Sequence, residues 1–158
     1  MRFRQLDRIT LLVPGERIEA QLTLKGDQDY LRDHFPRFPV QPGVLMLESL
    51  YQAAQFLVRA TEDYQSGLVM LKEAKNVKFA AFLQPGDTLT VEAEIMKEEA
   101  GLTTVKASGR NSSGATCVSG RLLIECQKNV PPTASDVWGR KYIREIVKQL
   151  QQAAMAGG

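Results

Sequence analysis

A histidine and a glutamate that follows it fourteen positions later are the residues whose types and spacing best suit acid–base chemistry. His34 is the only histidine of the 158-residue chain, and Pro36, Pro39 and Pro42 follow it closely. Proline fixes its own φ and restricts the residue before it, so this segment leaves His34 little backbone freedom. An imidazole held in this way can act as a general base, because proton transfer requires a fixed geometry.

Glu48 is the carboxyl group that could complete such a site. It lies in an apolar stretch, predicted as a helix over residues 44–60, and apolar surroundings favour the neutral, proton-donating form of a carboxyl group. A structural interpretation stays open, because the polar residues of this stretch form a single stripe, which is typical of the solvent face of an amphipathic helix. The stripe consists of Glu48, Gln52, Gln55 and Arg59. His34 has a similar alternative, as a packed ring bonded to the backbone.

Gly43 stands at the predicted start of this helix, directly after Pro42, which suits a first helical turn. The first N–H groups of a helix have no partner within the helix, and a glycine lets a ligand approach them closely. Such N–H groups can stabilise negative charge that develops on a substrate oxygen. An imidazole, a carboxyl group and a helix N-terminus together indicate a proton-abstraction site, without naming its substrate.

Composition and charge narrow the class of protein. A net charge of +2, with 44% hydrophobic and 24% charged residues, is ordinary for one globular domain and argues against a nucleic-acid binder. Cys117 and Cys126 are the only cysteines and form no C-x-x-C pair, so we expect no metal site. The first residues lack the apolar core of a signal peptide, and residues 40–58 are too polar to span a bilayer. We therefore expect a cytoplasmic protein without a membrane partner.

The elements that must position the site are one long helix and an antiparallel sheet. Period-two alternation and turn sequences predict strands, which fall at residues 3–13, 17–24, 68–83, 87–97, 102–110 and 115–126. Short turns, among them Gln84-Pro85-Gly86-Asp87, separate the last four runs and predict an antiparallel meander. A sheet of five or six strands wrapped around the helix is an α+β architecture.

A second helix is predicted near the C-terminus. Ser135 is its expected N-cap, and Asp136 falls in its first turn. Its apolar positions repeat with helical spacing, so one face should dock on its own domain or on another chain. We therefore expect a domain over residues 1–130, followed by a linker and an amphipathic helix over residues 131–158.

The segment that begins at His34 resembles the signature of the FabZ-type 3-hydroxyacyl-(acyl-carrier-protein) dehydratases, which have the hot-dog fold. That signature reads H-F-P-G-x-P-V-x-P-G-V-L, with an acidic residue and an A-Q-A-A-like sequence in the helix that follows. The matching positions are His34-Phe35-Pro36, Pro39-Val40, Pro42-Gly43-Val44-Leu45, Glu48 and Gln52-Ala53-Ala54. A glutamate as the acid is typical of the FabZ branch, whereas the FabA branch has aspartate. Weaker resemblance extends from Phe3 to about Glu125.

The resemblance implies the dehydration of 3-hydroxyacyl thioesters, bound to acyl carrier protein, to trans-2-enoyl thioesters in fatty-acid synthesis, with no cofactor and no metal. It implies that His34 removes a proton from C2 and that Glu48 of a partner chain protonates the departing hydroxyl. The Gly43 N–H would polarise the thioester carbonyl. It also implies a homodimer, with further assembly to a trimer of dimers common in the family.

The resemblance also implies a tunnel between subunits for the acyl chain, lined by side chains near the site. The candidates are Phe35, Val44, Leu45, Gln52, Phe79 and Phe82. Arg37 and Arg59 are candidates for binding the acidic carrier protein, although Arg37 replaces a glycine of the family pattern. Three alternatives stay open: a hot-dog thioesterase, a dehydratase for a specialised acyl or polyketide chain, and a non-catalytic subunit that binds carrier protein. The acyl chain length, and the choice between carrier protein and coenzyme A, stay open too.

Overall fold

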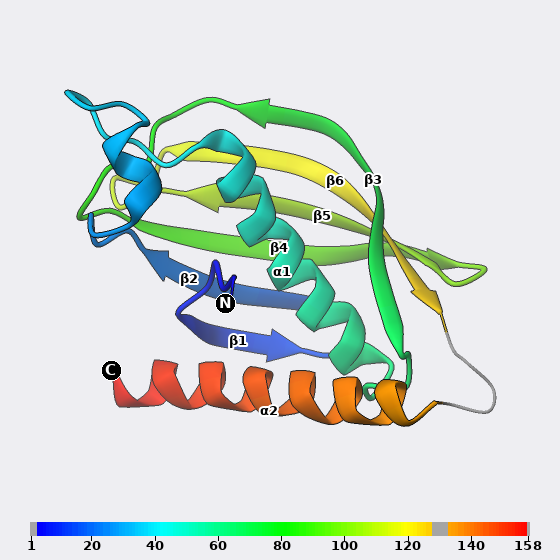
Figure 1. Cartoon of the computed structure of the whole chain (residues 1–158). Coiled ribbons are helices and arrows are strands. Elements are labelled where there is room, and N and C mark those ends of the chain that lie inside the picture. Colours follow the sequence, from blue (N-terminus) through cyan, green and yellow to red (C-terminus); the bar gives the residue numbers. More distant parts are fainter. Residues whose placement is uncertain (1–2, 128–132, 158) are drawn as a thin grey trace.

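A six-stranded sheet curves around one long helix in the computed structural model, which describes residues 3–127 and 133–157 (Figure 1). The elements in chain order are β1 (Arg8–Val13), β2 (Arg17–Thr23), the 3-10 helix η1 (Asp29–Arg32), α1 (Gly43–Thr61), β3 (Leu68–Phe79), β4 (Thr88–Glu99), β5 (Leu102–Arg110), β6 (Thr116–Gln127) and α2 (Ala134–Ala156). The strand order is β1-β2-β4-β5-β6-β3, and all neighbours are antiparallel. This confirms the predicted α+β architecture.

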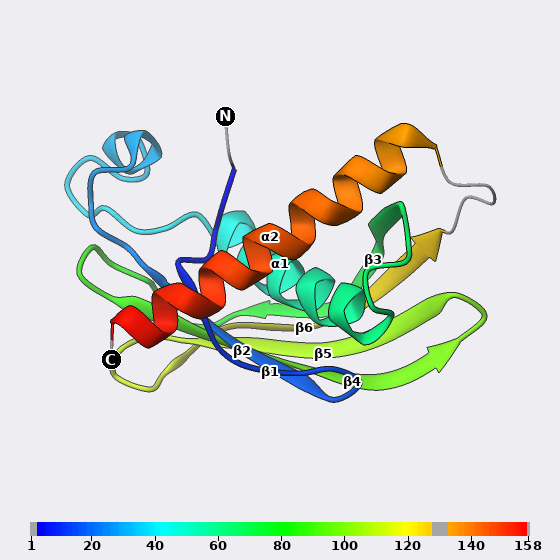
Figure 2. The same cartoon turned by 90° about the horizontal axis from the view of Figure 1, so that it is seen from below.

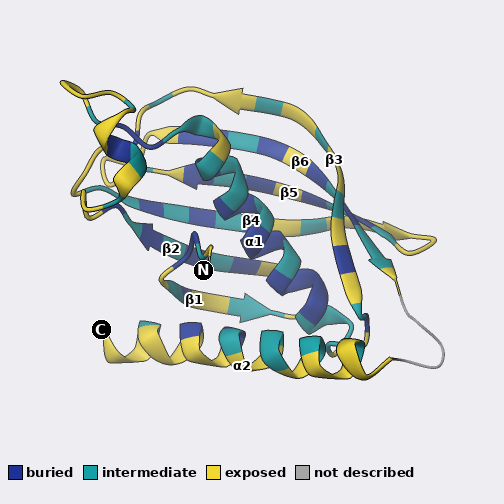
Figure 3. Ribbon diagram, in the orientation of Figure 1, coloured by how far each residue is buried: buried dark blue, intermediate teal, exposed yellow. Residues whose placement is uncertain are grey.

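Helix α1 is buried because the concave face of the sheet surrounds it. Its residues Leu50, Ala53 and Leu57 are fully buried against inward side chains of the strands. Strand β2 shows how the sequence builds that face, since its residues alternate strictly between more and less buried positions from Arg17 to Thr23. Figure 3 shows the buried residues concentrated on α1 and on the central strands. The helix therefore has a fixed direction, and its N-terminus lies beside the His34 segment.

Strand β3 departs from the predicted meander. It pairs with β6 at the far edge of the sheet, so the turn at Pro85 and Gly86 is not a hairpin between β3 and β4. The connection from β3 to β4 instead crosses the end of the sheet, where its backbone groups form hydrogen bonds with other segments. Gly86 N–H donates to Leu24 O, and Leu83 O accepts from Gln41 N–H, which precedes α1. The meander prediction was wrong for β3, and the crossing supports the loop that carries His34.

Helix α2 docks on its own domain. It runs along β1 at one edge of the sheet, and Figure 2 gives the view from the α2 side. Val147 and Leu150 are each only 2% exposed. The predicted N-cap was wrong, because Thr133 rather than Ser135 is the N-cap of the helix. Thr133 Oγ1 accepts from Asp136 N–H, and the Asp136 carboxylate accepts from Thr133 N–H, which is a capping box.

The predicted boundary at residue 130 lies outside the described residues, between β6 and α2. Among the residues that are described, neither helix has an apolar stretch long enough to cross a membrane.

The docking of α2 makes a prediction about stability. Leu150→Ala should lower the free energy of unfolding by about 2–5 kcal/mol, because it removes a buried side chain and leaves a cavity under the helix. Met155→Ala is the matched control on the same helix, where the side chain is 83% exposed and the change should stay within about 0.5 kcal/mol. Chemical denaturation measures both. Equal effects of the two substitutions would contradict the docking of α2 on its own sheet.

Candidate active site

His34 lies in the loop between η1 and α1, where hydrogen bonds fix both its backbone and its ring. Its N–H donates to Tyr30 O, and its carbonyl accepts from Val40 N–H at 3.0 Å. Its ring Nδ1 lies 3.0 Å from Val40 O. The peptide bond between His34 and Phe35 is cis, and the two rings stack with their centroids 4.4 Å apart.

The contact with Val40 determines which ring nitrogen is available. A carbonyl oxygen can only accept a hydrogen bond, so His34 Nδ1 must carry the proton in the neutral ring. The lone pair then lies on Nε2, which has no hydrogen-bond partner among the described residues. Nε2 is therefore the atom that can take a proton from a substrate.

Apolar side chains stand exposed in the His34 loop, at the start of α1, and at and just after the end of β3. A short loop closes on itself through reciprocal backbone bonds between Phe35 and Phe38, and the Phe38 ring meets Phe82 edge-on at 5.5 Å. We call the exposed group the aromatic rim. It consists of Phe35, Phe38, Val44, Phe79 and Phe82. Four of the predicted tunnel residues thus gather near the start of α1, and so large an exposed apolar group is typical of a binding or association surface.

Gly43 begins α1 as predicted, and Pro42 is the residue before the first turn rather than a member of it. A Cβ atom at Gly43 would lie only 3.0 Å from ring atoms of Phe79, so the glycine lets this ring lie against the start of the helix. Within the described residues, no hydrogen bond from the Gly43 N–H is found, as expected for the first turn of a helix. This N–H can therefore bind a substrate oxygen.

Glu48 is held by a glutamine one helical turn further on. Gln52 Nε2 donates to Glu48 Oε1 at 3.0 Å and to Phe3 O at 3.0 Å, while Gln52 Oε1 accepts from Gln5 N–H at 2.8 Å. The backbone N–H of Gln5 can bond only to the oxygen, so the orientation of the amide is fixed. One carboxyl oxygen of Glu48 is thereby bound, and no hydrogen bond to the other is found among residues 3–127 and 133–157. Gln52, predicted to line the tunnel, is buried and holds the acid.

The glutamine relay continues to the His34 loop. Gln41 Nε2 donates to Gln5 Oε1 at 3.1 Å, and Gln41 itself lies between Val40 and Pro42. Both side chains are buried, and Gln41 Oε1 has no partner among the described residues. The relay, defined as Gln52, Gln5 and Gln41, was not expected from the sequence. No local sequence pattern indicates it, because its three glutamines lie in separate segments of the chain.

Glu48 also lines a groove of about 390 Å³, which we call the acid groove. Its walls come from the segment before β1, from α1 and from α2. They include Phe3, Phe56, Tyr142, Ile143 and Ile146. His34 does not line this groove, and no hydrogen bond or ion pair joins His34 to Glu48 within the described chain. His34 and Glu48 of one chain therefore have different surroundings.

Tyr51 and Arg59, on the same helix, have structural surroundings. Burial raises the pKa of Tyr51, and the nearby charge of Glu48 adds to this, so its neutral hydroxyl donates to Val69 O. Arg59 is only 6% exposed and donates to Ser66 O at 3.2 Å. Burial lowers the pKa of Arg59, although the nearby Glu62 carboxylate opposes this shift. A side chain so buried cannot contact a carrier protein, so the structure does not support Arg59 as a docking residue. Arg37, the other candidate, is exposed near the aromatic rim.

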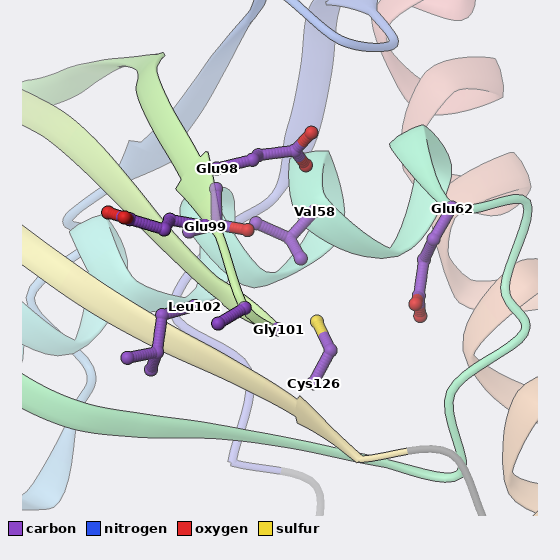
Figure 4. A pocket seen from close by; sticks show the side chains of 9 residues that line it. Val58, Glu62, Glu98, Glu99, Gly101, Leu102 and Cys126 are labelled. Atoms are coloured by element: carbon purple, nitrogen blue, oxygen red, sulfur yellow. The ribbon is translucent and has the colours of Figure 1, made fainter.

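A larger cavity of about 550 Å³ lies at the opposite end of α1 (Figure 4). Three carboxylates, Glu62, Glu98 and Glu99, line it together with Cys126. Burial first, and then the charge of Glu62, raise the pKa of the Cys126 thiol, so this sulfur is a poor nucleophile at neutral pH. Val58, the residue of α1 that lines this cavity, lies about 15 Å from Glu48 along the helix. Among the described residues, no cluster of His, Cys, Asp or Glu is suited to hold a metal ion.

Solved structures share this arrangement of a sheet wrapped around a helix. The dehydratase heterocomplex ApeI:P from Xenorhabdus doucetiae matches with a TM-score of 0.63 at 16% identity, over 85% of this chain and 87% of that chain. A hypothetical thioesterase with coenzyme A from Streptococcus pneumoniae matches with a TM-score of 0.61 at 9% identity, over 77% and 86%. At such low identity these likenesses define the fold alone, which is the hot-dog fold.

Sequence relatives identify the family within that fold. The model of the FabA-like domain matches residues 1–121, so the chain belongs to the FabA-like family. It is 35% identical to the 3-hydroxyacyl-[acyl-carrier-protein] dehydratase FabZ of Levilactobacillus brevis, over 71% of this chain and 76% of that protein. It is 36% identical to the protein of the same name from Ruminiclostridium cellulolyticum, over 66% and 73%. The match ends within β6, so α2 lies outside it.

The hydrogen bond to Val40 makes a prediction about the imidazole. Nitrogen-15 NMR of the single histidine, above the pH at which the ring is protonated, should show a proton on Nδ1 and a lone pair on Nε2. The reason is that the Val40 carbonyl requires a donor. His34→Ala removes the signal and confirms its assignment. A spectrum of the Nε2–H tautomer would contradict the geometry described for this loop.

Proposed function

We propose that this chain is a 3-hydroxyacyl-(acyl-carrier-protein) dehydratase of fatty-acid synthesis, which converts 3-hydroxyacyl thioesters to trans-2-enoyl thioesters. The observation that carries the proposal is the geometry of His34 in the loop that leads into α1: its Nδ1 is bound to Val40 O, while Nε2 has no hydrogen-bond partner among the described residues. The resemblance of the chain to FabZ dehydratases supports the choice of substrate.

His34 is the proposed base. Its Nε2 takes a proton from C2 of the substrate, and the electrons of that C–H bond form the double bond between C2 and C3. Negative charge develops on the thioester oxygen during this step, and the Gly43 N–H, at the positive end of α1, is the proposed donor to that oxygen. The stacked and hydrogen-bonded setting of the ring holds Nε2 in place before substrate arrives.

Glu48 is the proposed acid. Its Oε1 accepts from Gln52, and its Oε2, for which no partner is found among the described residues, is the proposed atom that gives a proton to the departing C3 hydroxyl. Water then leaves, the carboxylate is formed, and the proton taken by His34 restores the acid after product release. No metal or organic cofactor enters this scheme.

A second copy of the chain is the proposed source of the Glu48 that works with a given His34. No hydrogen bond or ion pair joins the two residues within the described part of one chain, and His34 does not line the groove that holds Glu48. The two edges of the sheet also differ. Helix α2 packs along β1, whereas β3 is an edge strand whose Leu68, Met70 and Phe79 are exposed among the described residues. An uncovered edge with apolar side chains is suited to pairing with another strand. A homodimer through β3 would bring the aromatic rims of two copies close to the shared sites.

Acyl carrier protein is the proposed partner, and the cytoplasm the proposed place of action. Carrier proteins are acidic, and Arg37 stands exposed near the aromatic rim, where a positive charge would favour their approach. Phe35, Val44, Leu45, Phe79 and Phe82 remain proposed tunnel residues. A trimer of dimers would be a further stage of assembly.

An enoyl thioester assay tests the function. Addition of water to the double bond removes the conjugated absorbance without releasing thiol, whereas a thioesterase would release thiol and a binding subunit would do neither. His34→Ala and Glu48→Gln should each lower the hydration rate by about 10²–10⁴-fold, because each removes a proton-transfer group.

Matched controls separate chemistry from folding. Glu94→Gln changes an exposed carboxylate on β4 and should leave the rate unchanged. Circular dichroism should show all variants folded. Thiol release by the unmodified protein, or full hydration activity in folded Glu48→Gln, would overturn the proposal.

A further inference from the structure

Helix α2 is an addition to the part of the chain that the family match covers, and contacts hold it to the domain at several points between Arg140 and Leu150. Near its start, Arg140 donates to Gln65 O at 3.0 Å, and Arg144 pairs with Asp63 at 3.1 Å. Further on, Val147 and Leu150 are buried against the domain. The position of the helix is therefore fixed, and the side chains that it turns toward α1 have a defined place.

Those side chains form one wall of the acid groove. Tyr142, Ile143 and Ile146, which we call the α2 wall, line the groove opposite α1. Ile143 and Ile146 are β-branched, so few rotamers are open to them and the wall is stiff. On the α1 side, Glu48 is a chemically active group, while Phe56 is apolar. The groove thus offers an acid at one point and apolar surface beside it.

We propose that the α2 wall bounds the path of the substrate's acyl chain and sets the chain length that the enzyme prefers. This inference rests on the proposed dehydratase function. Continuity with Glu48 favours an acyl chain as the occupant, because the group that reacts with C3 lies in the same groove as the apolar surface that would hold the rest of the chain.

The lining of the groove suits an alkyl chain in its apolar part, where Phe56, Ile143 and Ile146 lie beside Glu48. Its polar groups are those of Arg4, Gln55 and Tyr142, because both amide hydrogens of Gln52 are already bound to Phe3 O and Glu48. An alkyl chain needs no hydrogen-bond partner on the apolar part. A volume of about 390 Å³ falls within the range of small-molecule sites, roughly 300–1,000 Å³.

The test uses substitutions in the α2 wall that either enlarge or narrow the acid groove. Ile143→Ala with Ile146→Ala enlarges the groove, and Ile146→Phe narrows it. Activity is measured as kcat/KM for hydration of a series of enoyl thioesters from short to long. Each methylene that gains an apolar surrounding is worth about fourfold in binding. The enlarged variant should therefore raise the preference for long over short chains by about tenfold, mainly through KM, and Ile146→Phe should lower it.

The matched control removes apolar side chains from the exposed face of the same helix. Val137→Ala with Met155→Ala should leave the chain-length profile unchanged, because both side chains point to solvent. A wall that only stabilises the fold would lower the activity on all chain lengths in parallel. Parallel loss in both wall variants, or an unchanged profile with α2 still folded, would overturn the inference.

A binding measurement separates this inference from the proposed function. Trp138 is the only tryptophan, and its ring stacks on Tyr142 of the α2 wall with centroids 5.1 Å apart. Saturated acyl thioesters cannot be hydrated, but their binding in the groove should change the Trp138 fluorescence, with a chain-length optimum that shifts in the wall variants. If the protein hydrates no enoyl thioester but this shift is seen, the proposed dehydratase function is contradicted, while the binding of an acyl chain in the acid groove is supported. Hydration without any such shift overturns the α2 wall alone.

Discussion

The enclosure of α1 by the sheet is the constraint on which the rest of the structure depends. A helix surrounded by packed side chains cannot rotate or slide without opening cavities, so its first turn and its polar stripe have fixed places. The start of the helix offers the free N–H of Gly43, and the second turn offers Glu48. The crossing connection before β4 then supports the His34 loop through the bond from Gln41 to Leu83. Burial of the helix thereby organises groups that belong to three separate segments.

Polar contacts inside this apolar frame give each candidate catalytic group one defined state. The Val40 carbonyl selects the imidazole nitrogen that is free, and Gln52 binds one oxygen of Glu48. Both contacts are made before any substrate binds, which is the kind of arrangement that electrostatic catalysis requires. The buried pair of Gln5 and Gln41 connects the two regions, and Gln41 Oε1 has no partner within the part of the chain that the structure describes.

The sequence was most informative where local rules decide the structure. The prolines and Gly43 indicated a stiff segment before a helix, and alternation placed β2, β4, β5 and β6 within a few residues. Prediction from the sequence failed where the neighbour of a segment is decided by distant parts of the chain. Strand β3 looked like the first strand of a meander, but the choice between β4 and β6 as its neighbour depends on how the sheet closes around α1. The role of Gln52 was likewise hidden, since its partners Phe3 and Gln5 lie far away in the sequence.

The central claim is that two copies of the chain share each site, with His34 from one and Glu48 from the other. Subunit exchange between two inactive variants, His34→Ala and Glu48→Gln, tests it most directly. In a two-fold symmetric dimer each mixed pair regains one intact site, so random exchange should restore about one quarter of the unmodified activity. Recovery to this level is the expected result. No recovery, with exchange verified by mass spectrometry of the intact dimers, would contradict the account.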